Sequence, residues 1–164
     1  MKRFIIICCL CLSLLCICSC SNKAIDPDSN TPNVDAVKQK GELVILTNPT
    51  FPPFEYIGYA GRVEGIDMDI ANEIAKDMGV SLKVVSIDFD FLIDSLKSGK
   101  GQIVASAMTI TEERSKQVDF TDRYIKSSQY MLVPKDANID MNNLKDLTFS
   151  VQEGTKGEFY IVDE

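Results

Sequence analysis

Short apolar runs alternate with segments of helical periodicity along most of the chain. The run Leu43-Val44-Ile45-Leu46 is continuous, which is typical of a strand buried on both faces. Similar runs predict further strands over residues 82–87, 103–105, 130–133 and 149–151. Apolar positions at helical spacing predict helices over residues 67–78 and 90–98, a short helix after Thr111, and the start of another at 154–157. This alternation predicts an α/β fold with a parallel sheet that helices cover on both faces.

Glycines and a capping residue mark where several of these elements begin and end. Gly58 and Gly61 predict the turns of a small hairpin over residues 54–63. Asp67 is expected to cap the first long helix, and Gly79 occupies the position typical of a glycine that ends one.

The first 20 residues carry the features of an export signal. Lys2 and Arg3 precede an apolar stretch over residues 4–18, which is short for a membrane-spanning helix and suited to a signal peptide. Residues 17–20, Ile-Cys-Ser-Cys, resemble a bacterial lipobox. That resemblance implies that residues 1–19 are removed and that Cys20 receives a diacylglycerol thioether, which would anchor the exported protein to the membrane. A plain signal peptide or an uncleaved anchor is the alternative.

The next segment, residues 20–40, differs in composition from the rest of the chain. It is rich in Asn, Asp and Ser, contains Pro27 and Pro32, and has few large apolar side chains. Such a composition predicts a flexible tether between the lipid and a folded part that begins near Gly41.

Composition excludes several kinds of chemistry. All six cysteines of the 164-residue chain lie in the first 20 residues, so the body has no disulfide framework. The absence of His excludes imidazole zinc sites and His-based triads, and we expect neither a metal nor a cofactor. Without residues 1–19 the net charge is 15 − 24 = −9, so the chain lacks a basic footprint for nucleic acid.

Sites in open α/β sheets form at the carboxyl ends of the strands. Three loops of this chain meet that condition: residues 48–54, 106–114 and 152–156. Each loop has a plain structural alternative, since Phe51 can be a core aromatic residue and Arg114 a solvated helix residue.

Six motifs follow one another in a fixed order, and that order is more specific than any one of them. They are Phe51-Pro52-Pro53-Phe54-Glu55, Gly65-Ile66-Asp67-Met68-Asp69-Ile70-Ala71, Leu92-Ile93-Asp94-Ser95-Leu96-Lys97-Ser98-Gly99-Lys100, Ser106-Ala107-Met108-Thr109-Ile110-Thr111-Glu112-Glu113-Arg114, Val118-Asp119-Phe120-Thr121-Asp122 and Val151-Gln152-Glu153-Gly154-Thr155. Together they resemble bacterial extracellular solute-binding proteins (family 3 type) that serve polar-amino-acid ABC transporters, over about residues 42–155. The resemblance implies a two-lobed α/β fold of the type II periplasmic-binding-protein kind, which closes on its ligand.

The resemblance also divides the folded part of the chain. It implies a first lobe over residues 41–128 and a hinge strand with the start of a second lobe over residues 129–164, with one hinge near residues 128–130. The rest of the second lobe, and the segment that returns to complete the first lobe, would follow residue 164. We therefore expect the chain to be truncated.

The resemblance implies a site for a free amino acid, whose carboxylate and ammonium must both be satisfied when buried. Its expected residues are Asn48, Phe51, Phe89, Ser106, Ala107, Thr109, Arg114, Thr155 and Lys156. Arg114 would bind the carboxylate with its planar fork, assisted by the helix start at Thr155. Ser106 and Thr109 would hold the ammonium, and Ala107 has only its backbone to offer. Lys156 would favour an acidic ligand or merely reach solvent.

The aromatic rings complete this expected site. Phe51 and Phe89 match positions where rings flank the ligand in relatives, and Met108 would add another apolar wall beside the polar Asn48. Cation–π attraction to such rings is worth about 0.5–2 kcal/mol.

The leading interpretation is a lipid-anchored receptor, expected to be a monomer, that delivers an amino acid to an ABC permease by closing two lobes. An enzyme on the same fold, of the prephenate or arogenate dehydratase type, is an alternative, because Arg114 would hold a substrate carboxylate equally well. No acid/base pair is evident, since Glu55, Asp67 and Asp69 are expected to be a turn residue, a helix cap and a first-turn charge. A sensor input domain or a non-binding truncated remnant would also be compatible with these motifs.

Overall fold

The computed structural model describes residues 34–140 and 143–163. Its elements follow the chain in the order α2 (Val34–Lys40), β1 (Glu42–Thr47), β2 (Thr50–Phe51), β3 (Glu55–Ile57), the 3-10 turn η1 (Tyr59–Gly61), β4 (Val63–Glu64), α3 (Ile66–Met78), β5 (Ser81–Ser86), the 3-10 turn η2 (Phe89–Phe91), α4 (Leu92–Lys97), β6 (Ile103–Val104), α5 (Glu112–Ser115) and α6 (Lys156–Asp163). The alternation of strands and helices confirms the predicted α/β class.

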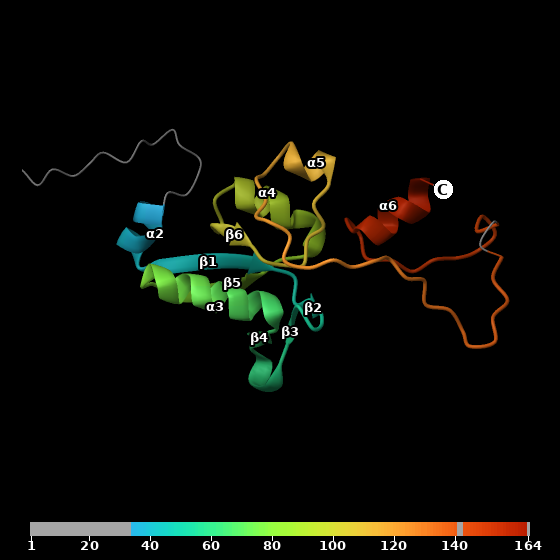
Figure 1. Cartoon of the computed structure of the whole chain (residues 1–164), viewed down its shortest axis with the longest axis horizontal. Helices are drawn as coiled ribbons and strands as arrows, with labels where there is room; N and C mark the ends of the chain where they lie inside the picture. Colours follow the sequence, from blue (N-terminus) through green and yellow to red (C-terminus); the bar gives the residue numbers. More distant parts are fainter. Residues whose placement is uncertain (1–33, 141–142, 164) are drawn as a thin grey trace, which may run out of the picture.

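β1 is the central strand of a three-stranded parallel sheet in the order β5-β1-β6. Leu43 lies opposite Leu82 of β5, and Ile45 lies between Val84 of β5 and Ile103 of β6. Figure 1 shows α3 along one face of this sheet and α4 along the other. The predicted parallel sheet with helices on both faces is therefore confirmed.

The hydrophobic core lies where β1 meets α3. Leu43 and Ile45 of β1 are at most 1% exposed, and they pack with Met68, Ala71 and Ala75 of α3. Leu46 belongs to the other face of the strand and is equally buried. A continuous apolar run is required here because both faces of β1 are covered.

A second, antiparallel sheet of β2, β3 and β4 connects β1 to α3. It contains the predicted hairpin, and β2 adds a short strand where a loop was expected. α3 begins after Gly65, whose φ is 130° and whose backbone lies against the Phe54 carbonyl, so that no side chain fits. The prediction that Asp67 caps α3 is wrong, because Gly65 is the N-cap and Asp67 lies buried inside the first turn. Gly79 ends the helix with a φ of 71°, as predicted.

Helix α2 occupies the last seven residues of the segment expected to be a flexible tether. Val37 is 4% exposed and packs into the core beside β1, which holds the helix on the sheet. An acidic residue in its first turn and basic residues in its last turn also suit the helix dipole. The tether prediction therefore fails for residues 34–40, while residues 20–33 and the export signal lie outside the described residues.

The chain after α5 is mostly extended and forms no strand within the described residues. Strands were predicted over residues 130–133 and 149–151, and both predictions are wrong, because no described strand lies beside either segment to complete a ladder. Tyr130 is accordingly 91% exposed and Leu132 is 100% exposed. Figure 1 shows this part of the chain running away from the sheet before α6 forms. None of the helices in the described part is long and apolar enough to span a membrane.

Candidate functional site

The carboxyl ends of the three parallel strands meet at one edge of the sheet, and predicted site residues follow them directly. Asn48 comes after β1, Phe89 opens η2 after β5, and Ser106 comes two residues after β6. The Asn48 backbone N–H donates to the Ser106 Oγ at 3.0 Å, although the two residues are 58 positions apart. The sheet topology therefore brings these residues to one place.

Arg114 is the charged centre of this edge. It lies in α5, where the Thr111 hydroxyl caps the helix by accepting from the Arg114 backbone N–H. The guanidinium turns back toward the strand end, with Nη1 donating to the Thr109 carbonyl at 2.6 Å and Nη2 donating to the Gly154 carbonyl at 2.8 Å. The residue is 7% exposed and forms no ion pair with any described residue. A buried guanidinium held only by neutral carbonyls is suited to bind an anion.

The ring of Phe89 lies beneath this cation. The Arg114 Cζ is 5.5 Å from the ring centroid, a cation–π distance. Burial lowers the pKa of Arg114, and the charge of neighbouring Glu113 partly opposes that shift. Because arginine keeps its proton in proteins, burial leaves it a desolvated charge that a bound carboxylate would stabilise.

A cavity of about 470 Å³ opens beside the guanidinium. Its lining includes Phe89, Met108, Arg114, Gly154, Lys156 and Phe159, together with the carboxylates of Asp90, Asp94 and Glu113. This volume lies within the range of small-molecule pockets. One buried cation among several acidic groups suits a ligand that carries charges of both signs.

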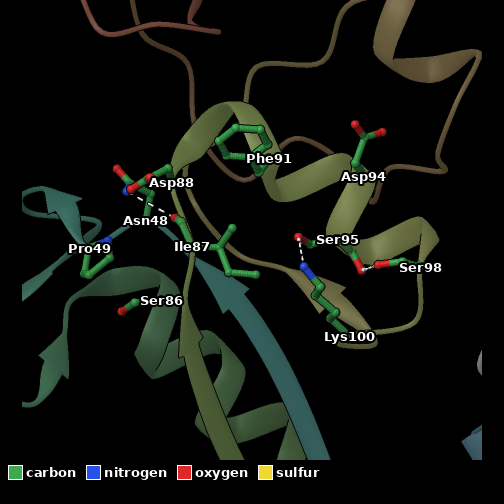
Figure 2. A pocket seen from close by; sticks show the side chains of 10 residues that line it. All are labelled: Asn48, Pro49, Ser86, Ile87, Asp88, Phe91, Asp94, Ser95, Ser98 and Lys100. Carbon is green, nitrogen blue, oxygen red and sulfur yellow. Dashed lines mark hydrogen bonds between the residues drawn. The ribbon is translucent and has the colours of Figure 1, made fainter.

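A larger cavity, of about 670 Å³, adjoins Asn48. Figure 2 shows hydrogen bonds among several of its polar groups. The Asn48 Nδ2 donates to the Ile87 carbonyl, and the Lys100 Nζ donates to the Ser95 Oγ. Its charged side chains, those of Asp88, Asp94 and Lys100, belong to exposed residues. The smaller cavity, which contains the buried guanidinium, is therefore the candidate site.

Glu55 is buried next to Ser106 at the same edge of the sheet. The Ser106 Oγ donates to its Oε1 at 3.2 Å, and Glu55 is 1% exposed. Burial, and then the charge of Asp67, raise the pKa of Glu55 to about 8. The expectation that Glu55 is a turn residue is wrong, because β3 directs its side chain inward to Ser106.

Asp67 bonds two loops from inside the first turn of α3. Its Oδ2 accepts the Ala107 backbone N–H at 2.8 Å, and its Oδ1 accepts the Tyr124 hydroxyl at 2.9 Å. Burial raises the pKa of Tyr124, and the charge of Asp67 raises it further. The Ala107 N–H, which was expected to face the ligand, is thus used within the protein.

Gln152 connects the loop before α6 to the edge of the sheet. Its Nε2 donates to the Asn48 Oδ1 at 2.9 Å, across 104 positions of sequence. Together with the bond from Arg114 to Gly154, it fixes the loop before α6 to the edge of the sheet.

The expected anion site at the start of α6 is already filled by the protein itself. The Glu158 carboxylate accepts the Gly154 N–H at 2.7 Å, and the Thr155 hydroxyl donates to the Gln152 carbonyl at 2.7 Å. Lys156 is exposed, and its Nζ lies 5.9 Å from the centroid of the Phe159 ring. Lys156 therefore lines the cavity with its ammonium beside the Phe159 ring, while the Thr155 hydroxyl is bonded to the Gln152 carbonyl just before α6.

The remaining predicted residues are outside the lining of the cavity. Phe51 is half-exposed and stacks on Phe54 with a centroid separation of 5.5 Å, whereas Thr109 is exposed and contributes its carbonyl to Arg114. Cys20 lies outside the described residues. In the described part of the chain, no three acidic or cysteine side chains are grouped to hold a metal ion.

Sequence reasoning missed the roles of Glu55, Asp67 and Gln152. Glu55 begins the short strand β3, directly after the buried Phe54. A carboxylate among such apolar residues is a signal for a buried polar group. Gln152 falls within a loop predicted to contribute to the site, but nothing in the sequence shows which loop residue reaches Asn48.

Comparisons with known proteins agree with this geometry. The sequence model for bacterial extracellular solute-binding proteins, family 3, matches residues 43–158. The chain is 38% identical over 128 residues to the arginine-binding periplasmic protein of Mannheimia haemolytica, covering 78% of this chain and 52% of that one. The chain spans about half the length of the curated relatives it matches.

Solved structures show the same similarity. The arginine-bound form of truncated ArgBP from T. maritima superposes with a TM-score of 0.74 and 40% identity, covering 79% of this chain and 63% of that one. An ancestral amino-acid-binding protein described as a precursor of cyclohexadienyl dehydratase superposes with a TM-score of 0.55 and 39% identity, covering 56% of this chain and 40% of that one.

Proposed function

The chain belongs to family 3 of the bacterial extracellular solute-binding proteins, and on that premise we propose that it captures a free amino acid with a positively charged side chain. The bound amino acid would pass to an ABC permease when two lobes open and close about a hinge near residues 128–130. No bond is made or broken in this function, so no cofactor is required.

The observation that carries the proposal is the buried guanidinium of Arg114. It has no carboxylate partner among the described residues and faces a cavity of about 470 Å³. The carboxylate of an amino acid would supply the missing negative charge, in a bidentate pair that the planar fork favours. The Ser106 carbonyl and the Thr109 hydroxyl would accept hydrogen bonds from the ammonium, since the Ser106 hydroxyl is already bonded to the Asn48 N–H and to Glu55. Phe89 would pack against the ligand.

The charges around the cavity favour a cationic ligand side chain. Three carboxylates, those of Asp90, Asp94 and Glu113, belong to its lining, against the two cations of Arg114 and Lys156. The rings of Phe89 and Phe159 in that lining offer apolar faces for the stem of the ligand side chain, and Phe51, which the resemblance places beside the ligand, is half-exposed and stacked on Phe54. Relatives in four genera are named arginine-binding proteins, and others are named histidine-binding proteins, which supports the same choice.

Titration calorimetry with L-arginine, L-lysine, L-glutamine and L-glutamate tests the proposal. We expect saturable binding of arginine, and weaker or no binding of glutamate. A preference for glutamate would instead assign Lys156 to the ligand side chain. Absence of binding for every amino acid, by protein that unfolds cooperatively, would overturn the proposal, and absence of cooperative unfolding would favour the truncated remnant.

We also propose that a lipid on Cys20 holds the protein at the outer side of the cell membrane. The support is the lipobox-like sequence Ile-Cys-Ser-Cys at residues 17–20. The intact mass of protein extracted from membranes should exceed that of the chain from residue 20 by a diacylglycerol and any amine-linked acyl group. Release of a Cys20→Ser variant from the membrane fraction is the second expected result, and unchanged membrane retention would contradict it.

An enzyme on this fold is the second candidate, because one structural relative is described as a dehydratase precursor. The buried carboxyl of Glu55, whose pKa is raised to about 8, is the kind of group that donates a proton in catalysis. Incubation of the protein with prephenate and arogenate, with spectrophotometric detection of aromatic products, separates the two functions. We expect no turnover.

A further inference from the structure

Three segments of the chain meet at the carboxylate of Asp67. The residue lies in the first turn of α3, and its own backbone N–H donates to the Phe54 carbonyl at 3.0 Å. Its two oxygens accept the Ala107 N–H at 2.8 Å and the Tyr124 hydroxyl at 2.9 Å. Asp67 is 2% exposed, so these bonds are shielded from competing water.

The bond to Ala107 holds a backbone conformation that is unfavourable on its own. Ala107 has a φ of 44°, in the left-handed region that non-glycine residues rarely adopt. Residues on both sides of Ala107 form contacts of the site. The Ser106 hydroxyl accepts the Asn48 N–H, and the Thr109 carbonyl, two residues further along, accepts from Arg114. A change in the backbone at Ala107 would therefore displace both contacts.

The bond to Tyr124 fixes a different part of the molecule. Tyr124 lies in a stretch, residues 116–140, that contains no helix or strand in the structure, and the residue is half-exposed. Its hydroxyl nevertheless turns inward to Asp67. The segment that leads from the sheet toward the loop before α6 is thus tied to the same carboxylate as the site.

We propose that Asp67 is a positioning residue that fixes the loop of residues 106–109 and the segment around Tyr124 to α3 as one unit. The loop takes its shape from Asp67, and the segment that must bend when the lobes move starts from the same anchor. The inference rests on the proposed function where it names the loop as part of a ligand site and where it has the segment bend as the lobes move.

Amide hydrogen exchange of the purified, ligand-free protein tests the positioning directly. In Asp67→Ala, which removes both acceptor oxygens, we expect exchange at Ala107 to accelerate at least tenfold, with faster exchange at residues 123–125, while the amides of β1 stay protected. The matched control is Asp69→Ala, which makes the same truncation at an exposed position in the same turn and should leave both segments unchanged. Tyr124→Phe removes a single hydroxyl and should accelerate exchange at residues 123–125 and, more weakly, at Ala107.

The outcomes separate the positioning role from general stability and from the proposed function. Exchange in Asp67→Ala that matches wild type at Ala107, or that accelerates equally in β1, would overturn the inference. If Asp67→Ala does not fold, Tyr124→Phe decides, and an unchanged Ala107 amide in that variant overturns it. With L-arginine as the probe, Asp67→Ala should bind at least tenfold more weakly than Asp69→Ala. If wild type binds no amino acid, the proposed function fails while the exchange result still stands.

Discussion

Two segments of this chain have the same kind of sequence and reach different structures. Residues 43–46 and 130–133 are both continuous apolar runs. The first is the centre of β1, with Ile45 and Leu46 fully buried, whereas the second forms no strand and leaves Leu132 100% exposed. β1 has β5 and β6 beside it, and residues 130–133 have no strand partner in the described part of the chain. An apolar run therefore specifies a capacity for burial, and the presence of partners decides whether that capacity is used.

The same contrast applies to the candidate site. The sheet region supplies the buried Arg114 and the bonded pair Asn48 and Ser106, each fixed by hydrogen bonds. The later region is bonded to the sheet edge by the Gln152 side chain and the Gly154 carbonyl, and it adds Lys156 and Phe159 to the cavity lining. We expect substitutions in the first region to be costly and those in the second to be mild.

The largest expected effect is on the core of β1. Leu46→Ala should lower the free energy of unfolding by about 2–5 kcal/mol, because it leaves a cavity in a fully buried position. Leu132→Ala, the same change in an exposed run, should alter it by less than about 0.5 kcal/mol. Urea denaturation followed by circular dichroism measures both. Equal losses in the two variants would show that residues 130–133 are packed in solution, and the contrast between the regions would then be lost.

The next effect tests the charge of the site. Arg114→Ala should weaken arginine binding by roughly 30-fold or more, since truncating one side of a buried charged pair costs about 2–5 kcal/mol. Arg114→Lys should recover only part of that loss, because an ammonium cannot make the bidentate pair. Arg62→Ala is the control, since the Arg62 side chain is 80% exposed and lies 3.9 Å from Glu64. Calorimetric titration that gives wild-type affinity for Arg114→Ala would exclude the site proposed here.

A third effect concerns the pH dependence of the sheet region. The pKa of Glu55 is about 8 in the folded protein against an ordinary value of 4.5, so the folded state holds this proton more tightly than the unfolded state. Stability from this group is therefore complete below about pH 4.5 and falls as pH rises toward 8, by at most roughly 1.4 kcal/mol per pH unit.

Glu55→Gln should abolish that slope, because a neutral amide of the same shape does not titrate. The variant should exceed wild type in stability at pH 9, while the exposed Glu73→Gln should follow wild type throughout. Denaturation midpoints measured from pH 5 to pH 9 give the comparison. Parallel curves for wild type and Glu55→Gln would mean that Glu55 is not held neutral by burial.

Local patterns were sufficient to predict elements whose partners are close in sequence or supplied by the sheet. β1, β5, α3 and the cap at Thr111 follow from apolar spacing and from single capping residues. The bond from the Arg114 guanidinium to the Thr109 carbonyl is also local, because the two residues are five positions apart.

The remaining features depend on contacts that local sequence does not encode. Aspartate is a common helix cap, but at the start of α3 the N-cap is Gly65. The Asp67 carboxylate instead accepts hydrogen bonds from Ala107 and Tyr124, which belong to distant segments of the chain. Helix α2 was missed because a single apolar residue, Val37, secures it to the core. In each case a long-range partner overrides the local preference, as tertiary contacts do for weak propensities.

The smallest expected effect tests the contact between the two regions. Gln152→Ala removes the 2.9 Å bond to Asn48 and leaves the rest of the loop in place. A neutral hydrogen bond contributes about 0.5–1.5 kcal/mol, so arginine binding should weaken about two- to tenfold, mainly through faster dissociation. A double-mutant cycle with Asn48→Ala isolates the bond, because once Asn48 is truncated the second substitution should cost almost nothing more. Fully additive losses would mean that Gln152 acts elsewhere, and the Gly154 carbonyl would then be the hydrogen bond that holds the later region to the sheet edge.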